Sequence, residues 1–375
     1  MEQHIPGIVL KDGLTQPVFD YKRCLFEKVY VETPVDTDGD GRLDLIAVYI
    51  RRPLETTQGM RVPAIYVANP YMLECNEDWY VPHDVDRDVS PYPQQHITES
   101  DITFDPSTVS FPQPRYPRAT VGYADTAPTE EIPLDCISDW YSYFNSRGYA
   151  SVFCGGLGTR GSQGFNCCGS PEETAAFKAV IDWLNGRCRA FTNLTDNIEI
   201  RADWCTGKVA MSGKSYLGTM CIAVASTGVE GLETIIPEAA ISNWYDYYRC
   251  NGLNLPAIGW QGDDLDILAK YCFSRAKDPE DYASVREAYA AWLEGIAADE
   301  DRDSGNYSRW WDMRNYLKAA DRFKASVFLV HGLADWNVKP THCVNLFAAM
   351  ESRGIPCKMM LHQGGHIYIH DLQGS

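Results

Sequence analysis

Positive charge is scarce in this sequence compared with negative charge. The 375 residues include 33 lysines and arginines against 51 aspartates and glutamates, which gives a formal net charge of −18. No run of basic residues offsets this imbalance locally. Because an acidic surface repels nucleic-acid phosphates and anionic lipid headgroups, the composition argues against a protein that binds either of them.

Long apolar runs are also missing. No stretch approaches the ~20 apolar residues that a transmembrane helix needs. The first residues, MEQHIPGIVLKDGLTQP, have neither the basic start nor the apolar centre of a signal peptide. We therefore expect a cytoplasmic protein without a membrane segment.

Cysteine pairs with metal-ligand spacing are absent too. The 13 cysteines include no C-x-x-C pair, and the adjacent Cys167 and Cys168 lack further ligands at the spacing of a zinc site. In a reducing cytoplasm such thiols act mostly as small buried apolar groups. We therefore predict neither a metal nor a cofactor.

An acidic turn, DTDGDGR, is the other candidate for a metal site. Asp36, Asp38 and Asp40 stand at the offsets of the first ligands in a calcium loop, but Ala47 occupies the twelfth position, where that loop needs a bidentate carboxylate. Strand-like runs lie on both sides of the turn. We interpret it as the turn of a β-hairpin.

The order of the apolar segments indicates the fold. Hydrophobic residues make up 45% of the chain, which is enough for a large core. From about residue 150 onward, short apolar runs typical of buried strands alternate with helical patterns. The clearest helix follows Ser170 as a cap and has Pro171 at its first position. This alternation predicts an α/β fold with a mostly parallel sheet and helices on both faces.

Residues 243–324 have a different character from the rest of the chain. They are aromatic, acidic and helical in pattern, and they lie between two predicted strands. We interpret them as a helical cap inserted into a sheet-based core that consists of residues 1–242 plus 325–375.

The stretch GKVAMSGKSYLGTM contains a Gly-Lys-Ser tripeptide that has two readings. A phosphate-binding loop needs a glycine five positions before Gly213, and Lys208 stands there. The alternative is a strand, a sharp turn that presents Ser215, and a helix that starts at once. Leu217 replaces the usual second glycine of that motif, and Gly218 follows it. Taken alone, the motif also fits a serine that caps an ordinary helix.

Two later positions support a nucleophilic serine. Asp335 follows the predicted strand ASVFLVHG, and His366 lies on a glycine-rich loop after the strand CKMMLH. Serine needs an imidazole to accept its proton, and the imidazole needs a carboxylate to fix its tautomer. The order Ser, Asp, His at the ends of successive strands is that of an α/β-hydrolase. His331 and His362 fall within strands, so we expect structural roles for them.

Several longer segments identify a family. GKSYLGTM, FKAVIDWLNGR, ISNWYDYYRCNG, HGLADWNVKP and LHQGGHIY closely resemble the Xaa-Pro dipeptidyl-peptidases, which are serine peptidases with an α/β-hydrolase domain. The resemblance implies an aminopeptidase that releases N-terminal dipeptides whose second residue is proline. It implies the triad Ser215, Asp335 and His366. It also implies an oxyanion hole formed by the hydroxyl of Tyr71 and the backbone N–H of Tyr216.

The resemblance also implies a substrate pocket. Trp244 and Tyr247 match the aromatic residues that contact proline in the family. Asp263 matches the acidic residue that binds the free α-ammonium group of the substrate, although the family more typically has glutamate there. The implied partner is a peptide with a free N-terminus and proline in second position, and a homodimer is a possible assembly.

The chain departs from the family in length. Family members carry a helical N-terminal domain and a C-terminal β-sandwich domain, and this sequence stops nine residues after His366. We therefore expect a gene fragment or a split reading frame, with apolar surface left open beside the last strand. Two alternatives stay open: a related hydrolase that acts on α-amino-acid esters or other acyl compounds, and an inactive fragment.

Overall fold

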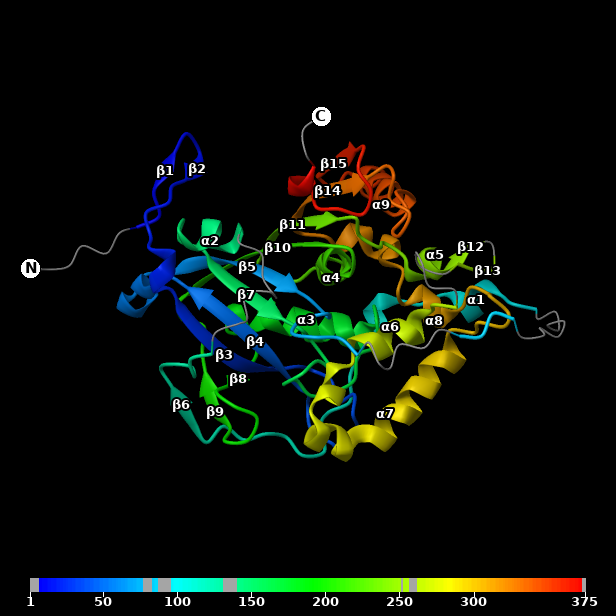
Figure 1. Cartoon of the computed structure of the whole chain (residues 1–375), viewed down its shortest axis with the longest axis horizontal. Helices are drawn as coiled ribbons and strands as arrows, with labels where there is room; N and C mark the ends of the chain where they lie inside the picture. Colours follow the sequence, from blue (N-terminus) through cyan, green and yellow to red (C-terminus); the bar gives the residue numbers. More distant parts are fainter. Residues whose placement is uncertain are drawn as a thin grey trace, which may run out of the picture.

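A large sheet organises the molecule. The computed structural model of the chain describes residues 7–76, 83–86, 96–130, 140–250, 252–255 and 262–372. Within them an 11-stranded sheet runs across the molecule (Figure 1). Six neighbouring strands, which include one edge of the sheet, are parallel. In spatial order they are β7 (Ala150–Cys154), β5 (Val62–Ala68), β10 (Cys205–Lys214), β11 (Leu232–Glu238), β14 (Ser326–Gly332) and β15 (Cys357–His362).

The other side of the sheet is mixed. β4 (Leu45–Arg52) is antiparallel to β7, and β3 (Leu25–Glu32) is antiparallel to β4. The predicted hairpin around the acidic turn, which joins β3 to β4, is therefore confirmed. The sheet continues with β8 (Ala190–Phe191), β9 (Ile198–Ile200) and β6 (Gly122–Ala124). Two small hairpins lie outside it. They are β1 (Leu10–Lys11) with β2 (Leu14–Thr15), and β12 (Arg249–Cys250) with β13 (Leu253–Asn254).

Two cores lie on opposite faces of the sheet, because successive residues of a strand point to opposite sides. Val152 belongs to the larger core and the adjacent Phe153 to the smaller one. The larger core contains the buried faces of three helices, and the smaller one contains Tyr141. The predicted α/β fold with helices on both faces is thus confirmed. The three helices are α3 (Pro171–Leu184), α4 (Tyr216–Ala225) and α9 (Thr341–Glu351), and Tyr141 lies in α2 (Trp140–Asn145).

The segment between β11 and β14 is mostly helical, as predicted. Its buried residues Trp244, Trp311 and Tyr316 belong to the same core as the sheet. The division into a core (1–242 plus 325–375) and a cap (243–324) stays a prediction. The helical elements of this segment are α5 (Trp244–Tyr248), α6 (Leu265–Cys272), η6 (Ser274–Lys277), α7 (Pro279–Asp299), α8 (Arg309–Asp312) and η7 (Tyr316–Arg322).

Short elements and loops complete the structure. Residues 81–120 are rich in Pro, Asp and Ser and lack any period, which predicts a long surface loop; residues 81–82 and 87–95 of this stretch lie outside the described part. The described elements not yet named are η1 (Tyr21–Arg23), η2 (Leu54–Gln58), α1 (Glu99–Ile102), η4 (Pro106–Thr108) and η8 (Ile369–Asp371). In the described part of the chain, none of the helices has both the length and the apolar character that a membrane crossing requires.

Apolar side chains are exposed at the edge of the sheet that β15 forms. Phe328 of β14 and Met360 of β15 are 37% and 41% exposed. The strand register pairs Phe328 with Lys358 and Val330 with Met360, so these side chains lie on one face. The expectation of open apolar surface beside the last strand is met at these positions.

Steric crowding explains why glycine, and not a larger residue, stands at position 218. A Cβ atom there would lie 2.7 Å from the carbonyl oxygen of Gly213 and 2.9 Å from that of Glu238. Both obstacles are backbone atoms at the ends of β10 and β11, so they do not move aside as a flexible side chain does. Gly218 therefore allows α4 to start directly against the sheet.

This contact predicts opposite effects for the same substitution in two helices. Gly218→Ala should lower the free energy of unfolding by about 1–3 kcal/mol through overpacking. Gly295→Ala in α7, where nothing lies within 4 Å of the added atom, should raise it by about 0.5–1 kcal/mol. Urea denaturation of both variants measures the difference. Equal midpoints for Gly218→Ala and the unsubstituted protein would show that the steric account is wrong.

Candidate active site

Ser215 occupies the sharp turn between β10 and α4. Its backbone has φ 63° and ψ −127°, a conformation that non-glycine residues rarely adopt. The Ser215 N–H donates to the carbonyl oxygen of Glu238 at 2.9 Å, which holds the turn against the end of β11. At Gly213 an added Cβ would lie 2.5 Å from the Cβ of Leu217. The segment is therefore a strand, a tight turn and a helix, with no extended loop to surround a phosphate.

Asp335 and His366 form a hydrogen-bonded pair. The Nδ1 of His366 lies 2.8 Å from the Oδ2 of Asp335. The Oδ1 of Asp335 accepts the backbone N–H groups of Asn337 and Val338, each at 2.9 Å. Asp335 is buried and the His366 side chain is 21% exposed. With its Nδ1 bound to the carboxylate, His366 has Nε2 left for a second partner.

The turn at Ser215 and the loop of His366 are in contact. The ammonium group of Lys214, the residue before Ser215, donates to the carbonyl oxygen of His366 at 3.3 Å. Among the described residues, no hydrogen bond joins the hydroxyl of Ser215 to His366. The structure thus places the three predicted triad residues at adjoining strand ends, and their joint catalytic role stays a prediction.

The other histidines of this region have structural surroundings. His331 lies in β14 as predicted, and its Nε2 is 2.7 Å from the carbonyl oxygen of Val338. Burial lowers the pKa of His331, so it is neutral near pH 7. His362 ends β15, and its Nδ1 accepts the N–H of Gly364 at 3.1 Å. His366 is therefore the best placed of the three to exchange protons with a substrate.

Tyr71 and Tyr216 lie side by side near the turn. Their rings meet edge to face with centroids 5.7 Å apart. Burial raises the pKa of the Tyr71 phenol well above its usual range, so the hydroxyl stays protonated. None of the described residues accepts a hydrogen bond from that hydroxyl. Tyr216 is the first residue of α4, where backbone N–H groups have no partner inside the helix. Both groups are available as donors to a developing oxyanion.

The predicted pocket aromatics continue this cluster. The Trp244 ring lies 5.1 Å from Tyr216 and 6.1 Å from Tyr247. Trp244 is 0% exposed, and its indole N–H donates to the hydroxyl of Tyr316 at 3.1 Å. Tyr247 is 8% exposed and donates to the Oδ1 of Asn337 at 2.6 Å, beside Asp335. The structure therefore brings these aromatics together, with Tyr247 nearest to the loop of the acid.

Asp263 lies just before α6 and is buried. Burial, followed by the negative charge of Asp263, raises the pKa of the Tyr248 phenol, so the carboxylate is close to the aromatic cluster. The next residue, Asp264, has other partners and binds Arg249 at 2.9 Å and Arg302 at 2.8 Å. Asp263, one of the predicted site residues, thus lies between α6 and the aromatic cluster.

Comparison with known proteins agrees with this geometry. Residues 38–368 match the family described as X-Pro dipeptidyl-peptidase (S15 family). This chain belongs to that family. The resemblance predicted from the sequence is therefore confirmed.

The relatives are considerably longer than this chain. It is 45% identical to the Xaa-Pro dipeptidyl-peptidase of Pediococcus pentosaceus over 361 residues, which are 96% of this chain and 44% of the relative. It is 43% identical to that of Lacticaseibacillus casei over 372 residues, 99% of this chain and 46% of the relative. Among solved structures, Pyrococcus horikoshii acylaminoacyl peptidase is 12% identical, with a TM-score of 0.47 over 95% of this chain and 40% of its own. The chain spans less than half the length of its two S15 relatives.

Sequence reasoning missed Glu173, which supports the Tyr216 side of the site. The Tyr216 hydroxyl donates to its Oε1 at 2.7 Å, and the N–H of Gly169 donates to its Oε2 at 2.6 Å. Burial raises the pKa of Glu173 to about 7. The available signal was its place three residues after the cap Ser170, where the capping-box pattern puts a glutamate.

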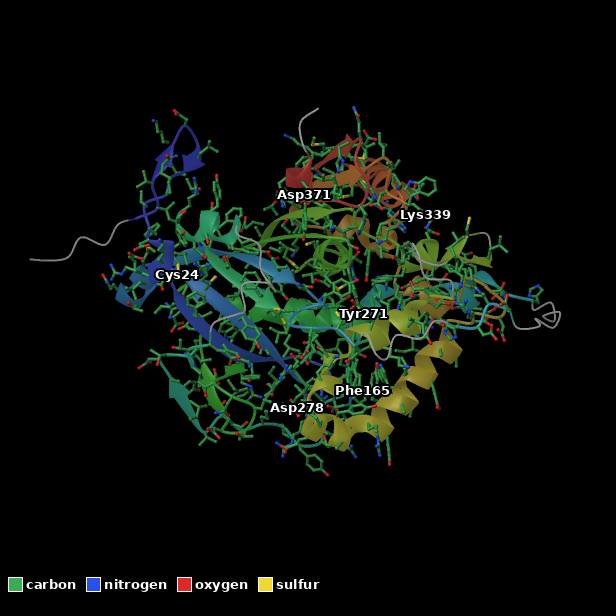
Figure 2. All side chains as sticks on the ribbon, viewed as in Figure 1. Cys24, Phe165, Tyr271, Asp278, Lys339 and Asp371 are labelled. Atoms are coloured by element: carbon green, nitrogen blue, oxygen red, sulfur yellow. The ribbon has the colours of Figure 1, made fainter. Side chains whose placement is uncertain are left out.

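Tyr271 and Asn337 were missed as well. Tyr271, labelled in Figure 2, packs its ring 6.1 Å from that of Tyr71. Asn337 lies two residues after Asp335, and its Oδ1 accepts a hydrogen bond from the hydroxyl of Tyr247. Tyr271 stands in no recognisable motif, and the segment HGLADWNVKP that contains Asn337 suggested no role for it, so only the folded chain shows that they border the site.

His342 predicts a loss of stability in acid. It is fully buried in α9, and its Nδ1 accepts the N–H of Ser242 at 3.4 Å. Burial, helped by His331 and Lys339, lowers its pKa from 6.5 to about 3. His342 therefore binds a proton more tightly in the unfolded chain than in the folded one. Its contribution to the free energy of unfolding is fully present above pH 6.5 and is lost as the pH decreases toward 3. From pH 7.5 to 5.0 this residue should cost about 2 kcal/mol.

Urea denaturation at the two pH values measures this effect. His342→Asn keeps an acceptor near the position of Nδ1 and should show a smaller loss of stability at pH 5.0. His370→Asn, at an exposed histidine, should behave as the unsubstituted protein does. A loss for His342→Asn as large as that of the unsubstituted protein would contradict the assignment.

Proposed function

We propose that this chain is a serine exopeptidase that releases N-terminal Xaa-Pro dipeptides through an acyl-enzyme on Ser215. The single observation that carries the proposal is the 2.8 Å contact between the Nδ1 of His366 and the buried carboxylate of Asp335, whose two oxygens both have hydrogen-bond partners. Family membership and the strained turn at Ser215 support it. The curated relatives that match this chain bear the name Xaa-Pro dipeptidyl-peptidase.

The proposed chemistry follows from these groups. His366 accepts the proton of the Ser215 hydroxyl at Nε2, while Asp335 holds its Nδ1–H and stabilises the imidazolium. The serine oxygen attacks the carbonyl carbon of the proline residue. The Tyr71 hydroxyl and the Tyr216 N–H donate to the oxyanion. His366 then protonates the departing amine, and water releases the dipeptide from the serine by the same steps.

The proposed specificity combines a flat apolar contact with a charge. Tyr247 contacts the pyrrolidine ring of proline, because its ring borders the Asp335 loop. The resemblance implies that Trp244 contacts proline as well, but because its side chain is fully buried we propose that it instead packs behind Tyr216 and Tyr247. Asp263 binds the α-ammonium group of the substrate. A chain held at both points presents the bond after its second residue to Ser215.

We also propose that the protein works in the cytoplasm. The described cysteines are all free thiols, which suits a reducing compartment. A homodimer stays a prediction from the family resemblance.

Replacing the nucleophile tests the mechanism. Ser215→Ala should lower kcat/KM for an Xaa-Pro amide by a factor on the order of 10⁵ to 10⁶ and should abolish labelling by a serine-directed fluorophosphonate. Ser212→Ala, in the same strand but bonded to a backbone carbonyl, is the matched control and should keep both. Activity is measured with a chromogenic prolyl amide.

Each contrary outcome has a distinct meaning. Full activity in Ser215→Ala would remove the proposed mechanism. A folded protein that takes up no label would favour an inactive fragment. Labelling together with faster cleavage of α-amino-acid esters than of prolyl amides would favour the related hydrolase.

The role of Asp263 predicts a preference for free N-termini. The unsubstituted protein should cleave a prolyl amide with a free amine much faster than its acetylated form. Asp263→Asn should lower kcat/KM for the free substrate about 100-fold and change the acetylated one little. Asp246→Asn, at an exposed aspartate of α5, is the control for loss of one negative charge. Equal rates on the two substrates in the unsubstituted protein would remove this role.

A further inference from the structure

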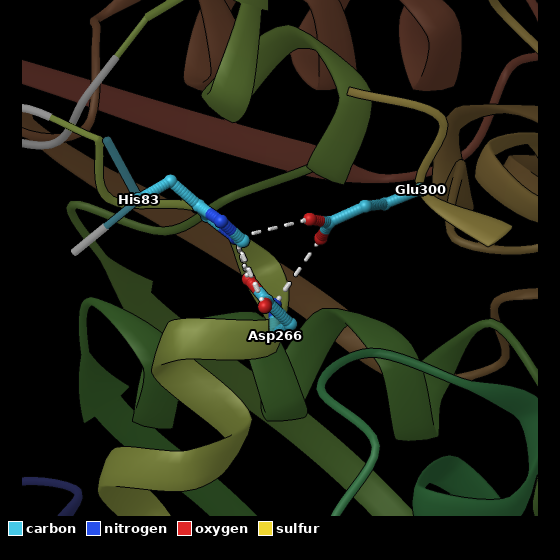
Figure 3. Close-up of side chains that lie close together, drawn as sticks. All are labelled: His83, Asp266 and Glu300. Atoms are coloured by element: carbon cyan, nitrogen blue, oxygen red, sulfur yellow. Dashed lines mark hydrogen bonds and ion pairs between the residues drawn. The ribbon is translucent and has the colours of Figure 1, made fainter. Parts of the chain in front are cut away.

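Three side chains from distant parts of the chain converge beside the proposed amine pocket (Figure 3). The Nε2 of His83 lies 2.9 and 3.0 Å from the two carboxylate oxygens of Asp266, and 3.7 Å from the Oε1 of Glu300. His83 belongs to the described segment 83–86, Asp266 to the first turn of α6, and Glu300 directly follows α7. The three residues share no sequence motif, so this grouping could not be predicted from the sequence.

Glu300 has an unsatisfied oxygen that faces this cluster. Its side chain is 0% exposed, and its Oε2 accepts the backbone N–H of Asp266 at 3.2 Å. Its Oε1 has no hydrogen-bond partner among the described residues, and the Nε2 of the half-buried His83 lies 3.7 Å from it. A buried polar atom without a partner is costly. The oxygen is therefore positioned for a ligand that the described part of the chain does not supply.

The arginines near the cluster are engaged mainly by another carboxylate. The nearby Arg249 and Arg302 both bind Asp264. Arg249 also donates to the backbone carbonyl oxygen of Glu300 at 3.3 Å, and among the described residues His83 is the basic side chain in contact with both the Asp266 and the Glu300 carboxylates.

The donor set and its spacing fit a metal ion. One imidazole and two carboxylates are common ligands of zinc and related divalent ions. Bonds of ~2.0–2.2 Å separate neighbouring ligand atoms by roughly 3 to 3.6 Å, close to the distances from His83 to the two carboxylates. An ammonium group, held by longer hydrogen bonds of about 2.8 Å, would keep its acceptors further apart. His83 is 32% exposed, which gives an ion a way in from solvent.

We propose that His83, Asp266 and Glu300 bind one divalent transition-metal ion, such as Zn²⁺, which fastens the segment 83–86 to α6 and to the end of α7. The backbone N–H of His83 donates to the carbonyl oxygen of Gly262 at 3.0 Å. Gly262 directly precedes Asp263, so the ion stabilises the chain next to the residue proposed to bind the substrate amine. The metal has a structural role, and its binding does not depend on peptidase activity.

The acidic turn at Asp36, Asp38 and Asp40 is a less suitable site. Asp38 is paired with Arg275 at 3.0 Å, and Asp36 accepts the N–H of Gly41 at 2.9 Å. The turn also lacks an imidazole ligand. It serves as an internal control for weak binding of cations to carboxylates.

Zinc titration of the metal-free protein tests the proposal. After treatment with EDTA and its removal, the protein should bind one Zn²⁺ per chain by calorimetry and elemental analysis, and its melting temperature should rise. Glu300→Gln and His83→Ala should each bind zinc at least about tenfold more weakly. Asp36→Asn, and Glu294→Gln at an exposed position of α7, should bind it as the unsubstituted protein does.

The variants separate a lost ligand from a lost fold. Glutamine has the same shape as glutamate and keeps an acceptor oxygen for the backbone N–H of Asp266, so metal-free Glu300→Gln should melt close to the metal-free unsubstituted protein. His83→Ala, at a partly exposed residue, gives a second test if Glu300→Gln is unstable. Failure of the unsubstituted protein to bind zinc would overturn the proposal. Undiminished binding in both variants would do so as well, because it would place the ion elsewhere, for instance on thiols.

Discussion

The left-handed backbone of Ser215 is the constraint on which the candidate site depends. A non-glycine residue with φ 63° stores roughly 1–3 kcal/mol of strain, and it persists because its surroundings permit no other path. The N–H of Ser215 is bound to the end of β11, and two glycines let the strand and the helix approach each other within van der Waals contact. The packing of β10, β11 and α4 thus offsets this strain and holds the Ser215 hydroxyl at the edge of the sheet.

The loops after β14 and β15 act as a unit with this turn. Parallel strands end at the same edge of a sheet, so the loops that carry Asp335 and His366 meet there. Ala334 donates its N–H to the carbonyl oxygen of Gly364 at 3.1 Å, which joins the two loops directly. Asp335 has donors for both of its oxygens, whereas His331 is buried and neutral. The ionisable pair that remains at the edge is therefore the one between Asp335 and His366.

An aromatic cluster connects the segment 243–324 to the sheet. Tyr216 belongs to α4, and Trp244 and Tyr247 belong to α5, yet their rings are in contact. A Cβ atom at Gly169 would lie 2.1 Å from the indole nitrogen of Trp244, so the loop before α3 is fitted to that ring. Glu173 then ties α3 to Tyr216. The segment 243–324 therefore shares its packing with the turn of the candidate nucleophile, and its aromatic residues border the proposed substrate site.

Local pattern was sufficient for the longer strands of the sheet, the helix at 171–184, the hairpin at the acidic turn and the turn at Ser215, because hydrophobic period, capping residues and small residues act over a few positions. The short strands β6, β8 and β9 were not predicted. Chain order and the ends of parallel strands then indicated Asp335 and His366. Tertiary structure alone decided that Trp244 is fully buried, that Glu173 binds Tyr216, and that His83, Asp266 and Glu300 meet. These contacts join residues far apart in the chain, and their energies come from burial and charge, which no local sequence pattern records.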